Sequence, residues 1–384
     1  MKKVILVNSY YCPDIIGGAE ISTQLLAQGL NNHFDVHVVV TGSHKRGIIR
    51  EIVNGVKVYR LPILNIYSPL ESSNISNIKK LIWHLVNIYN PIKGILVKKL
   101  LQEIKPDIIN TQNLMGIGTF IWKIAKDLSI PVIHTTRDYA LINPVNNSIV
   151  NRFIHKINVK RSRDVRYVVG ISNFILRKHI DESLFNKAKK ITIGNVVDSK
   201  RQERSEVDPN SPITIGYFGQ ISANKGVETL ISAIKDIDAA TVKEIIICGS
   251  GELLSKIKKL AEYDRRIVLK GKLTPDKVAQ QMAKVDLTIV PSIWEEPFGR
   301  VIIESFQQGT PVLASDVGGI PELIDDKKML FEKQNVNQLR EKIIRFKKLS
   351  YQDRNKLIKN SYDESEKYRN NIEDYIKIYS EFIN

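Results

Sequence analysis

Cysteine is scarce in this 384-residue chain, and long apolar runs are absent. The two cysteines, Cys12 and Cys248, lie in separate halves at no metal-ligand spacing, which excludes a disulfide framework and fits a reducing cytosol. No run approaches the ~18 apolar residues that a membrane-spanning helix needs. The first apolar stretch, Val4–Val7, is too short for the core of a signal peptide and predicts a β-strand instead. We therefore expect a cytoplasmic protein.

The rest of the composition is that of a globular chain with an uneven distribution of charge. The length accommodates two domains, and 43% hydrophobic with 26% charged residues is typical of such domains. Residues 1–195 hold 27 Lys and Arg against 12 Asp and Glu, a net charge of +15, whereas residues 196–384 carry +1. This asymmetry predicts an anionic partner for the first half: a membrane surface, a phosphorylated acceptor or nucleic acid. A basic surface that serves only solubility is the alternative.

Short apolar strands alternate with helical segments in both halves, which predicts parallel sheets covered by helices on both faces. The expected strands are Val4–Tyr10, Val36–Thr41, Asp107–Thr111, Pro131–Thr136, Val165–Ile171, Lys190–Gly194, Ile213–Phe218, Glu244–Cys248, Ile267–Lys270, Asp286–Val290 and Pro311–Ala314. Helical spacing covers Ile21–Leu30, Ile92–Ile104 and residues 352–384. The polar segment 196–212 is the predicted linker. The predicted fold class is α/β, with two doubly wound, Rossmann-like domains.

The most informative stretch is Pro291–Leu323, PSIWEEPFGRVIIESFQQGTPVLASDVGGIPEL. A buried strand is predicted to run into an exposed turn, after which Gly299 opens a helix. Glu296 in the turn and Glu304 within the helix can then face the same ligand. Arg300 beside the helix amides, next to a glycine that permits close approach, makes an anion site. A phosphate and hydroxyl groups bound together indicate a nucleotide sugar.

This stretch resembles the signature of the retaining glycosyltransferases of family 4. The matching residues are Pro291, Ser292, Glu296, Pro297, Phe298, Gly299, Glu304, Gly309, Pro311, Val312, Gly318, Gly319 and Glu322. A strand–turn–helix with solvated glutamates is the alternative, but so many ordered matches favour the functional interpretation. The resemblance implies the GT-B architecture, in which two Rossmann-like domains face each other across a cleft. It places an acceptor-side domain at 1–195 and a nucleotide-sugar-binding domain at 213–365, with a final helix, about 366–384, packed on the first domain.

Glycine turns after three predicted strands can cradle phosphate or simply make tight turns. These glycines are Gly17, Gly18, Gly219, Gly249 and Gly251. In the resembled family, the first pair reaches toward the donor diphosphate and the last pair lies near the nucleotide base. Lys225, at the start of a predicted helix, is placed to add positive charge. The family's usual arginine is Gln220 here, so Lys225 and Arg300 have to stabilise the leaving group.

The donor site can be assigned roles. We expect Lys225 and Arg300 to bind the diphosphate, Glu296 to orient the donor sugar, and Glu304 to accept hydrogen bonds from the ribose. Phe298 and Gly299 complete this set. The resemblance implies a retaining reaction, and we expect no metal and no cofactor, because cationic side chains and helix amides act in place of a divalent ion. The segment 236–238 matches an Asp-x-Asp metal motif by letter, but a solvated turn is expected there.

Pro131–Pro144 also resembles a family segment, a strand that ends in Thr-x-His-Asp-Tyr. Arg137 stands at the histidine position and is followed by Asp138. Arginine cannot act as a general base at neutral pH, so we expect it to bind a donor phosphate or an acidic acceptor. His134, three residues earlier, is expected in the core of the strand. The candidate catalytic residues are Glu296, Lys225, Arg300, Asp138 and Arg137.

An amphipathic stretch in the basic half, Ile75–Leu101, predicts docking on an anionic membrane surface. Its apolar residues at helical spacing are Ile75, Ile78, Ile82, Leu85 and Tyr89, and its lysines are Lys79, Lys80, Lys93, Lys98 and Lys99. Trp83 is expected to act as an interfacial anchor. A pair of ordinary helices whose apolar stripe faces the core is the alternative.

The expected partners are a nucleoside-diphosphate sugar, a lipid-linked glycan or polysaccharide acceptor and an anionic membrane surface, without nucleic acid. The expected process is cell-surface glycan synthesis, in lipopolysaccharide or capsule assembly or in glycolipid synthesis, by a peripheral protein on the inner face of the cytoplasmic membrane. Residues 42–100 match no motif, so the acceptor stays open. A sugar-nucleotide epimerase of the same fold and a non-catalytic partner of another glycosyltransferase are the alternatives.

Overall fold

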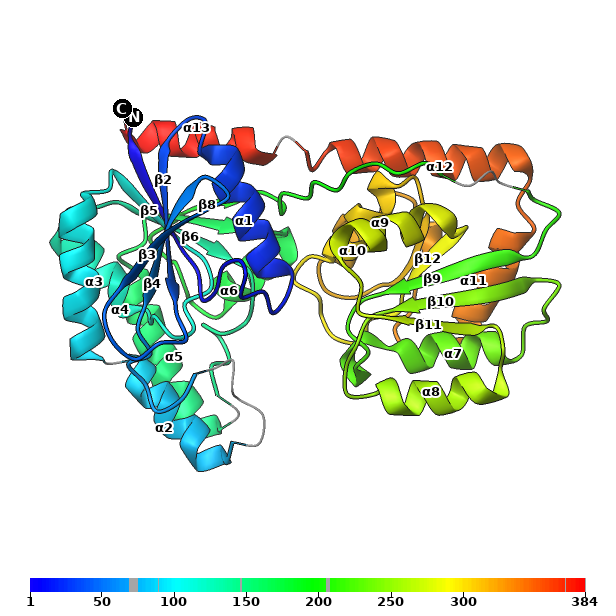
Figure 1. Cartoon of the computed structure of the whole chain (residues 1–384), viewed down its shortest axis with the longest axis horizontal. Coiled ribbons are helices and arrows are strands. Elements are labelled where there is room, and N and C mark those ends of the chain that lie inside the picture. Colours follow the sequence, from blue (N-terminus) through cyan, green and yellow to red (C-terminus); the bar gives the residue numbers. More distant parts are fainter. Residues whose placement is uncertain (69–74, 89, 146, 205–207, 370, 384) are drawn as a thin grey trace. The chain divides into compact units, whose positions relative to one another are not determined.

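The structure, a computed structural model, describes residues 1–68, 75–88, 90–145, 147–204, 208–369 and 371–383. It divides into two compact units (Figure 1). Unit 1 comprises Met1–Val196 and the C-terminal stretch from Asn371, and unit 2 comprises the residues between them. Each unit has its own sheet and its own hydrophobic core.

An eight-stranded sheet in the order β3-β4-β2-β1-β5-β6-β7-β8 forms the centre of unit 1. Its strands are β1 Lys3–Val7, β2 Asp35–Thr41, β3 Ile49–Val53, β4 Val56–Leu61, β5 Ile108–Thr111, β6 Val132–Thr136, β7 Tyr167–Gly170 and β8 Lys189–Thr192. Strands β3 and β4 pair antiparallel, and the other neighbours pair in parallel. Asn54 and Gly55 join β3 to β4 with φ of 50° and 81°, as such a two-residue hairpin requires. The expected strands lack this hairpin, which makes the sheet mixed rather than wholly parallel.

Helices cover both faces of this sheet (Figure 1). They are α1 Gly18–Leu30, α2 Asn77–Ile88, α3 Pro91–Ile104, α4 Phe120–Asp127, α5 Ser148–Ser162, α6 Asn173–Asp181 and α13 Asn371–Ile383. The helices α1 and α13 pack on one face, where Tyr379 accepts a hydrogen bond from Asn110 Nδ2 at 2.6 Å. The helices α3 and α4 pack on the other face around the buried Trp122.

A six-stranded parallel sheet in the order β11-β10-β9-β12-β13-β14 forms the centre of unit 2. Its strands are β9 Ile213–Phe218, β10 Val242–Cys248, β11 Ile267–Gly271, β12 Leu287–Val290, β13 Val312–Ser315 and β14 Leu330–Phe331. Its helices are α7 Val227–Lys235, α8 Leu254–Tyr263, α9 Pro275–Lys284, α10 Arg300–Gln307, α11 Val336–Lys347 and α12 Tyr351–Glu366. Side chains of α7, α8 and α11 share one core, and those of α9 and α10 pack in another.

Two expected segments differ at the boundary between the units. The helix expected at about 366–384 is α13 alone, and the preceding α12 belongs to unit 2. The segment expected as a linker, 196–212, lies against unit 2 along its first part, where Gln202 N donates to Gln308 Oε1 at 2.8 Å. Its polar composition suggests a free connection, but Ser199 Oγ accepts from Gln308 Nε2 at 2.8 Å and Arg204 Nη1 donates to Thr310 Oγ1 at 2.6 Å, both just after α10.

The strand order reverses in both sheets beside the first strand of the unit. Strand β1 lies between β2 and β5, and β9 lies between β10 and β12. At such a reversal the carboxyl ends of the strands leave a crevice in which α/β proteins bind ligands. The loops after β9 and β12 carry Lys225 and Glu296, so the fold itself brings these predicted residues to one edge. The predicted fold class, with two doubly wound α/β domains, is confirmed.

Candidate active site

The loops after β9 and β12 are joined by backbone contacts. Asn224 O accepts hydrogen bonds from Ile293 N at 2.9 Å and from Trp294 N at 3.1 Å. Gly226 has a φ of 68°, and a Cβ on it would lie 1.8 Å from Pro291 O, so no other residue permits this approach. The glycine after Lys225 is therefore required by the packing of the two loops.

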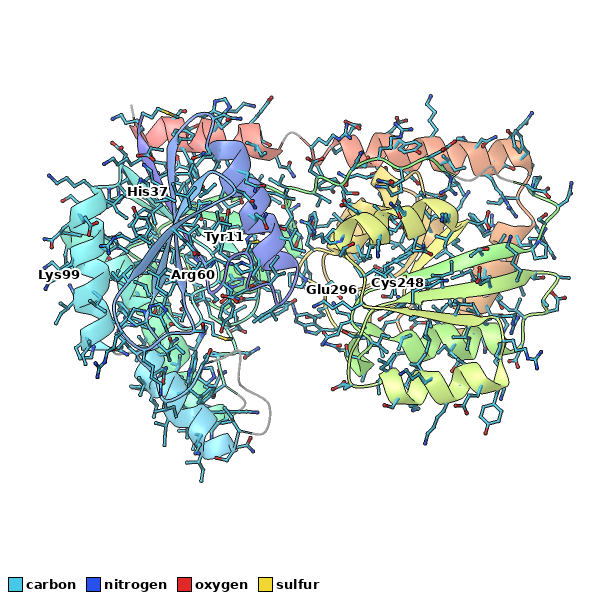
Figure 2. All side chains as sticks on the ribbon, in the orientation of Figure 1. Tyr11, His37, Arg60, Lys99, Cys248 and Glu296 are labelled. Carbon is cyan, nitrogen blue, oxygen red and sulfur yellow. The ribbon has the colours of Figure 1, made fainter. Side chains whose placement is uncertain are left out.

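These loops place Lys225 and Glu296 side by side, although 71 residues separate them in the sequence. Lys225 Nζ donates to Glu296 Oε1, which also accepts from Ser292 Oγ at 2.8 Å. Gly319 N donates to Glu296 O at 2.7 Å, so the second glycine turn of the motif fixes the backbone of this glutamate. Glu296, labelled in Figure 2, follows the end of β12, and Lys225 follows the end of β9. The ion pair thus lies at the carboxyl edge of the sheet.

A second ion pair lies on the first turns of α10. Arg300 Nε donates to Glu304 Oε1 at 2.7 Å, and these side chains are 13% and 25% exposed. Gly299 precedes Arg300 with a φ of 108°. Phe298 is buried and packs edge-on against Tyr368 at 5.6 Å between ring centroids. Glu304, expected to keep its carboxylate for hydroxyl groups, shares it with Arg300.

The other candidate glycines of unit 2 pack loop against loop. A Cβ on Gly249 would lie 1.8 Å from Gly219 O, and one on Gly251 would lie 2.3 Å from Ile221 O. These contacts explain the glycines without a ligand. Gly219 and Gln220 are nevertheless exposed, so a ligand can reach the turn after β9.

No three His, Cys, Asp or Glu side chains gather into a metal-binding set in the part of the chain that the structure describes. Asp236 and Asp238 lie at the end of α7. Asp236 Oδ2 pairs with Arg340 Nη2 at 2.5 Å, and Asp238 Oδ1 accepts from Thr241 N at 2.7 Å. This arrangement is the turn that the sequence indicates.

Unit 1 brings a polar cluster to the carboxyl ends of β1, β5 and β6. Arg137 is buried and donates from Nε to Gln112 Oε1 at 2.8 Å and from Nη1 to Asn195 Oδ1. Gln112 Oε1 also accepts from Thr23 Oγ1 of α1 at 2.5 Å. Arg137 therefore binds protein oxygens and ties β5 and β6 to the segment that follows β8.

Two carboxyl groups lie in the same region. Glu20 is buried, and its Oε2 accepts from Gly17 N at 2.8 Å, while Gly17 and Gly18 themselves are exposed. Asp138 Oδ1 accepts from Ala140 N at 2.8 Å. Burial raises the pKa of both carboxyl groups. At Asp138 the hydrogen bond from Ala140 N–H lowers the pKa, whereas the charge of Glu20 raises it further. These groups hold a proton more readily than exposed carboxylates do.

His134 lies inside β6, in the core, as the sequence predicts. Its ring stacks on Phe185 at 5.1 Å, and its Nδ1 lies 2.9 Å from Thr111 Oγ1. Burial lowers the pKa of this histidine well below its ordinary value. The imidazole is therefore neutral.

Each of the two units matches a known protein family. Residues 198–364 match the family described as Glycosyl transferases group 1, and residues 16–201 match Glycosyltransferase Family 4. An uncharacterized 42.6 kDa protein in the cps region of Klebsiella pneumoniae is 34% identical over 334 residues, 83% of this chain and 87% of that protein. An uncharacterized glycosyltransferase of Methanocaldococcus jannaschii is 30% identical over 347 residues, 89% of this chain and 87% of that protein. The chain belongs to the glycosyltransferases.

Solved structures share the fold of this glycosyltransferase. Sucrose-phosphate synthase from Thermosynechococcus elongatus has a TM-score of 0.73 at 16% identity, covering 99% of this chain and 100% of that chain. Anabaena HepE in complex with UDP and glucose has a TM-score of 0.71 at 18% identity, with coverage of 99% and 100%. At these identities the likeness concerns the fold alone, and it agrees with the GT-B class.

Two residues that the structure places at the candidate sites were not among the site residues predicted from the sequence of the glycosyltransferase. Trp294 is 41% exposed, and Lys225 Nζ lies 5.7 Å from its ring centroid, a favourable arrangement for a cation. An aromatic side chain inside an exposed turn was the available signal. Glu20 was detectable from its spacing, because an acid three residues after Gly17 is typical of a helix cap.

Proposed function

We propose that the chain is a retaining, metal-independent glycosyltransferase that moves a sugar from a nucleoside-diphosphate sugar to a lipid-linked or polysaccharide acceptor in cell-surface glycan synthesis. The observation that carries this proposal is the pairing of Lys225 with Glu296 and of Arg300 with Glu304 at one edge of the unit 2 sheet. Two cations beside two carboxylates offer contacts to both the charged and the hydroxyl-bearing parts of such a donor.

The reaction breaks the bond between the anomeric carbon and the diphosphate oxygen, so negative charge grows on the leaving group. Lys225 and Arg300, together with the amides at the start of α10, stabilise that charge. Glu296 accepts hydrogen bonds from the donor sugar and orients it. The oxygen of the acceptor hydroxyl forms the new bond to the anomeric carbon on the face that the leaving group vacates, so the configuration is kept. The departing phosphate takes the proton of that hydroxyl.

The genetic region of one relative and the molecules bound in one solved structure support a role in surface glycans. The Klebsiella pneumoniae relative is a protein of the cps region, and the Anabaena HepE structure contains UDP and glucose. These facts concern those proteins, and they favour a uridine nucleotide and a capsule-type glycan as the first candidates for this chain.

A panel of UDP-, GDP-, ADP- and dTDP-sugars tests the proposal. We expect one nucleotide to bind in calorimetry and its sugar donor to be hydrolysed slowly without an acceptor, with the released nucleoside diphosphate as the measured product. Conversion of the donor to its epimer would indicate the epimerase alternative. Tight binding without turnover, even with membrane lipid extracts as acceptors, would indicate a non-catalytic partner subunit.

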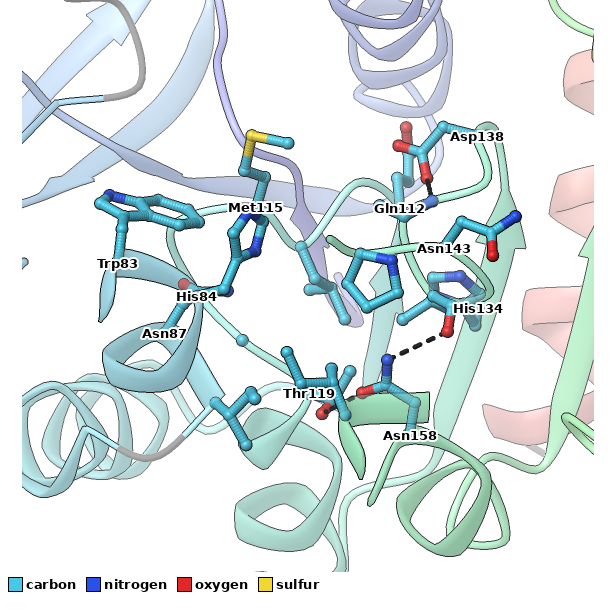
Figure 3. A pocket seen from close by; sticks show the side chains of 17 residues that line it. Trp83, His84, Asn87, Gln112, Met115, Thr119, His134, Asp138, Asn143 and Asn158 are labelled. Atoms are coloured by element: carbon cyan, nitrogen blue, oxygen red, sulfur yellow. Dashed lines mark hydrogen bonds between the residues drawn. The ribbon is translucent and has the colours of Figure 1, made fainter. Parts of the chain in front are cut away.

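We further infer that unit 1 docks peripherally on an anionic membrane surface at the inner face of the cytoplasmic membrane. Helices α2 and α5 lie side by side (Figure 1), and both line one pocket (Figure 3). Their exposed large apolar side chains, here called the apolar patch, are Ile78, Ile82, Leu85, Ile149 and Phe153. A basic set of exposed lysines, Lys79, Lys80, Lys98 and Lys99, accompanies it on α2 and α3. Exposed apolar side chains and exposed lysines on neighbouring segments of the chain are the composition of a surface that enters the headgroup region of anionic lipids.

The structure corrects parts of the predicted membrane segment. Trp83, expected as an interfacial anchor, is 2% exposed and donates from Nε1 to Tyr67 O at 3.0 Å. Lys93 is buried, and its Nζ donates a hydrogen bond to Gly116 O. Tyr89 lies outside the described residues. Within the described chain, no helix has both the length and the apolar character that a membrane crossing requires.

A further inference from the structure

A pocket of about 260 Å³ in unit 2 lies at the edge of the sheet opposite the candidate active site. Its walls come from α11, from α12 and from the segment 326–329, which immediately precedes β14. Because the sheet is parallel, the start of β14 marks its amino edge, whereas Lys225 and Glu296 follow strands at the carboxyl edge. The described lining therefore contains none of the predicted donor residues.

Four cations line this pocket, here called the basic pocket: Lys328, Lys342, Arg345 and Lys356. They form a local excess, because residues 196–384 carry a net charge of only +1. Lys342 and Arg345 stand three residues apart on α11, where side chains are neighbours and like charges repel each other. Burial and the charge of Arg345 lower the pKa of Lys342, although the charge of Asp326 opposes this effect. An anion bound between the two cations would remove their repulsion.

The two acids of the described lining, Asp326 and Asp353, are engaged in local caps. Asp326 Oδ1 accepts from Lys328 N at 3.0 Å, and Asp353 Oδ2 accepts from Ser350 Oγ at 2.7 Å. Among the residues that the structure describes, neither carboxylate forms an ion pair with a cation of the basic pocket. The caps therefore leave the positive charge of the pocket without a close counter-ion.

The cations of the basic pocket are accessible to a ligand. Lys342 Nζ is held by its hydrogen bond to Lys328 O at 2.6 Å. The side chains of Lys328, Arg345 and Lys356 are exposed, and they form no hydrogen bond or ion pair with the described part of the chain. Four cations and two acids give the lining a net charge of +2. A phosphate monoester matches this charge, because it carries about −1.5 to −2 at pH 7, whereas a carboxylate carries only one negative charge.

The floor of the basic pocket is apolar, which indicates that the ligand has a carbon skeleton. Leu313 of β13 and Phe346 of α11 are 1% and 4% exposed, and both line the pocket. A second cavity of about 60 Å³ adjoins it, since Met329, Leu357 and Asn360 line both. A cavity of about 150 Å³ accommodates benzene, so the larger basic pocket has room for a phosphate together with an apolar group.

We propose that the basic pocket binds a phosphate monoester with a single alkyl or aryl group. The phosphate lies between Lys342, Arg345 and Lys356, and the carbon skeleton extends over Leu357 toward the adjoining cavity. A soluble metabolite and a membrane lipid can both present this chemistry, but a cavity of about 60 Å³ has room for one short chain rather than two. We therefore assign the site to a free, single-chain organic phosphate. This assignment goes beyond the proposed glycosyl transfer and does not depend on it.

Met329 gives a direct probe, because it lines both cavities and the chain has only four methionines. The test is methyl NMR of the full chain with ¹³C-methyl methionine, titrated with hexyl phosphate below its micelle concentration. We expect a saturable shift of the Met329 methyl, weaker binding of inorganic phosphate, and no shift with hexanol or dihexanoyl phosphatidic acid. Met115 in unit 1 and Met282, buried elsewhere in unit 2, should not respond.

A pair of double variants connects that signal to the charges of the basic pocket. Arg345→Gln combined with Lys356→Gln removes two exposed cations, so the affinity for hexyl phosphate should fall at least about tenfold. Lys348→Gln combined with Lys359→Gln is the matched control and should keep the affinity, since these exposed lysines lie after α11 and on α12 outside the described lining. Unchanged methyl signals of the other methionines show that each variant is folded.

Two single variants test the apolar group and the separation from the donor site. Asn360→Phe, at an exposed position shared by both cavities, should reduce the affinity for hexyl phosphate to that for inorganic phosphate. Lys225→Ala should keep the full Met329 response, because Lys225 lies at the other edge of the sheet. A response that is lost in Lys225→Ala would place the phosphate in the proposed donor site and refute the basic pocket.

The proposal is also overturned if hexyl phosphate gives no saturable shift of Met329, if both double variants lose the same affinity, or if hexanol or the phosphatidic acid binds as well as hexyl phosphate. Calorimetry with UDP, GDP, ADP and dTDP on the same samples separates these outcomes from the proposed function. Loss of the Met329 response with intact nucleotide binding refutes the basic pocket alone, and a chain that binds none of these nucleotides refutes the transfer reaction.

Discussion

Replacing Lys225 with alanine tests the proposed donor site most directly. The Lys225 side chain is 27% exposed and is held at the sheet edge by its ion pair with Glu296. A charge-assisted hydrogen bond to a diphosphate contributes about 1.5–3 kcal/mol, and partial exposure favours the lower part of that range because water screens the charge. A loss of about 1.5–2 kcal/mol corresponds to a rise of about 10- to 30-fold in the Kd of the nucleoside diphosphate.

The ion pair adds a second contribution that a double-mutant cycle can isolate. In Lys225→Ala the Glu296 carboxylate keeps Ser292 but loses its cation, so it repels the diphosphate. Glu296→Gln removes this repulsion and leaves Lys225 to the phosphate, so nucleotide affinity should hold or rise. The double variant should then bind more tightly than Lys225→Ala alone.

Isothermal calorimetry with the tightest-binding nucleoside diphosphate measures each Kd. Lys235→Ala is the matched control, since it removes the same charge from the exposed far end of α7. An unchanged Kd in Lys225→Ala, or an equal loss in Lys235→Ala, would refute the assignment of Lys225 to the diphosphate.

Four further results are expected. Glu304→Gln should raise the KM for the donor roughly five- to tenfold, because a hydrogen bond to the ribose is lost. Glu296→Gln should lower kcat more than it changes KM. Steady-state kinetics in which both variants act alike would contradict these roles. EDTA should leave the rate unchanged, and a loss restored by manganese or magnesium would show that the cationic side chains do not suffice. Burial and a hydrogen bond with Asp325 raise the pKa of Glu364 from 4.5 to about 7. The folded chain therefore binds this proton more tightly than the unfolded chain does, and the free energy of unfolding falls as the pH rises between these values. Glu364→Gln should raise the Tm above pH 7 but not below pH 4.5, and an equal effect at both pH values would contradict the shift. The protein should float with phosphatidylglycerol vesicles at low salt, but not at high salt or after charge reversal of the basic set. Each lysine contributes about 1 kcal/mol at most, so several must act together. Binding that is insensitive to the charge reversal would show that these helices form an ordinary surface.

The sequence by itself determined the fold class and predicted a donor-site motif. Alternating apolar strands and helices predicted both sheets, since a segment buried on both faces must be apolar throughout. The motif from Pro291 to Leu323 predicted Glu296, Arg300 and Glu304 as site residues. Local spacing explains why Arg300 and Glu304, four residues apart on one helix, meet. The Asn54-Gly55 pair also carried a hairpin signal, which the strand assignment overlooked.

Only the tertiary structure decided which distant groups meet and which face of a helix is buried. Periodicity shows that α2 is amphipathic, but it cannot show that Trp83 faces the core while Ile78 faces solvent, because that depends on what packs against the helix. The contact of Lys225 with Glu296 depends on the order of β9 and β12 in the sheet, which no local pattern specifies. The two hydrogen bonds of Gln112 Oε1 likewise arise only where β5, β6 and α1 converge. Local interactions fix the elements, and long-range packing fixes the sites between them.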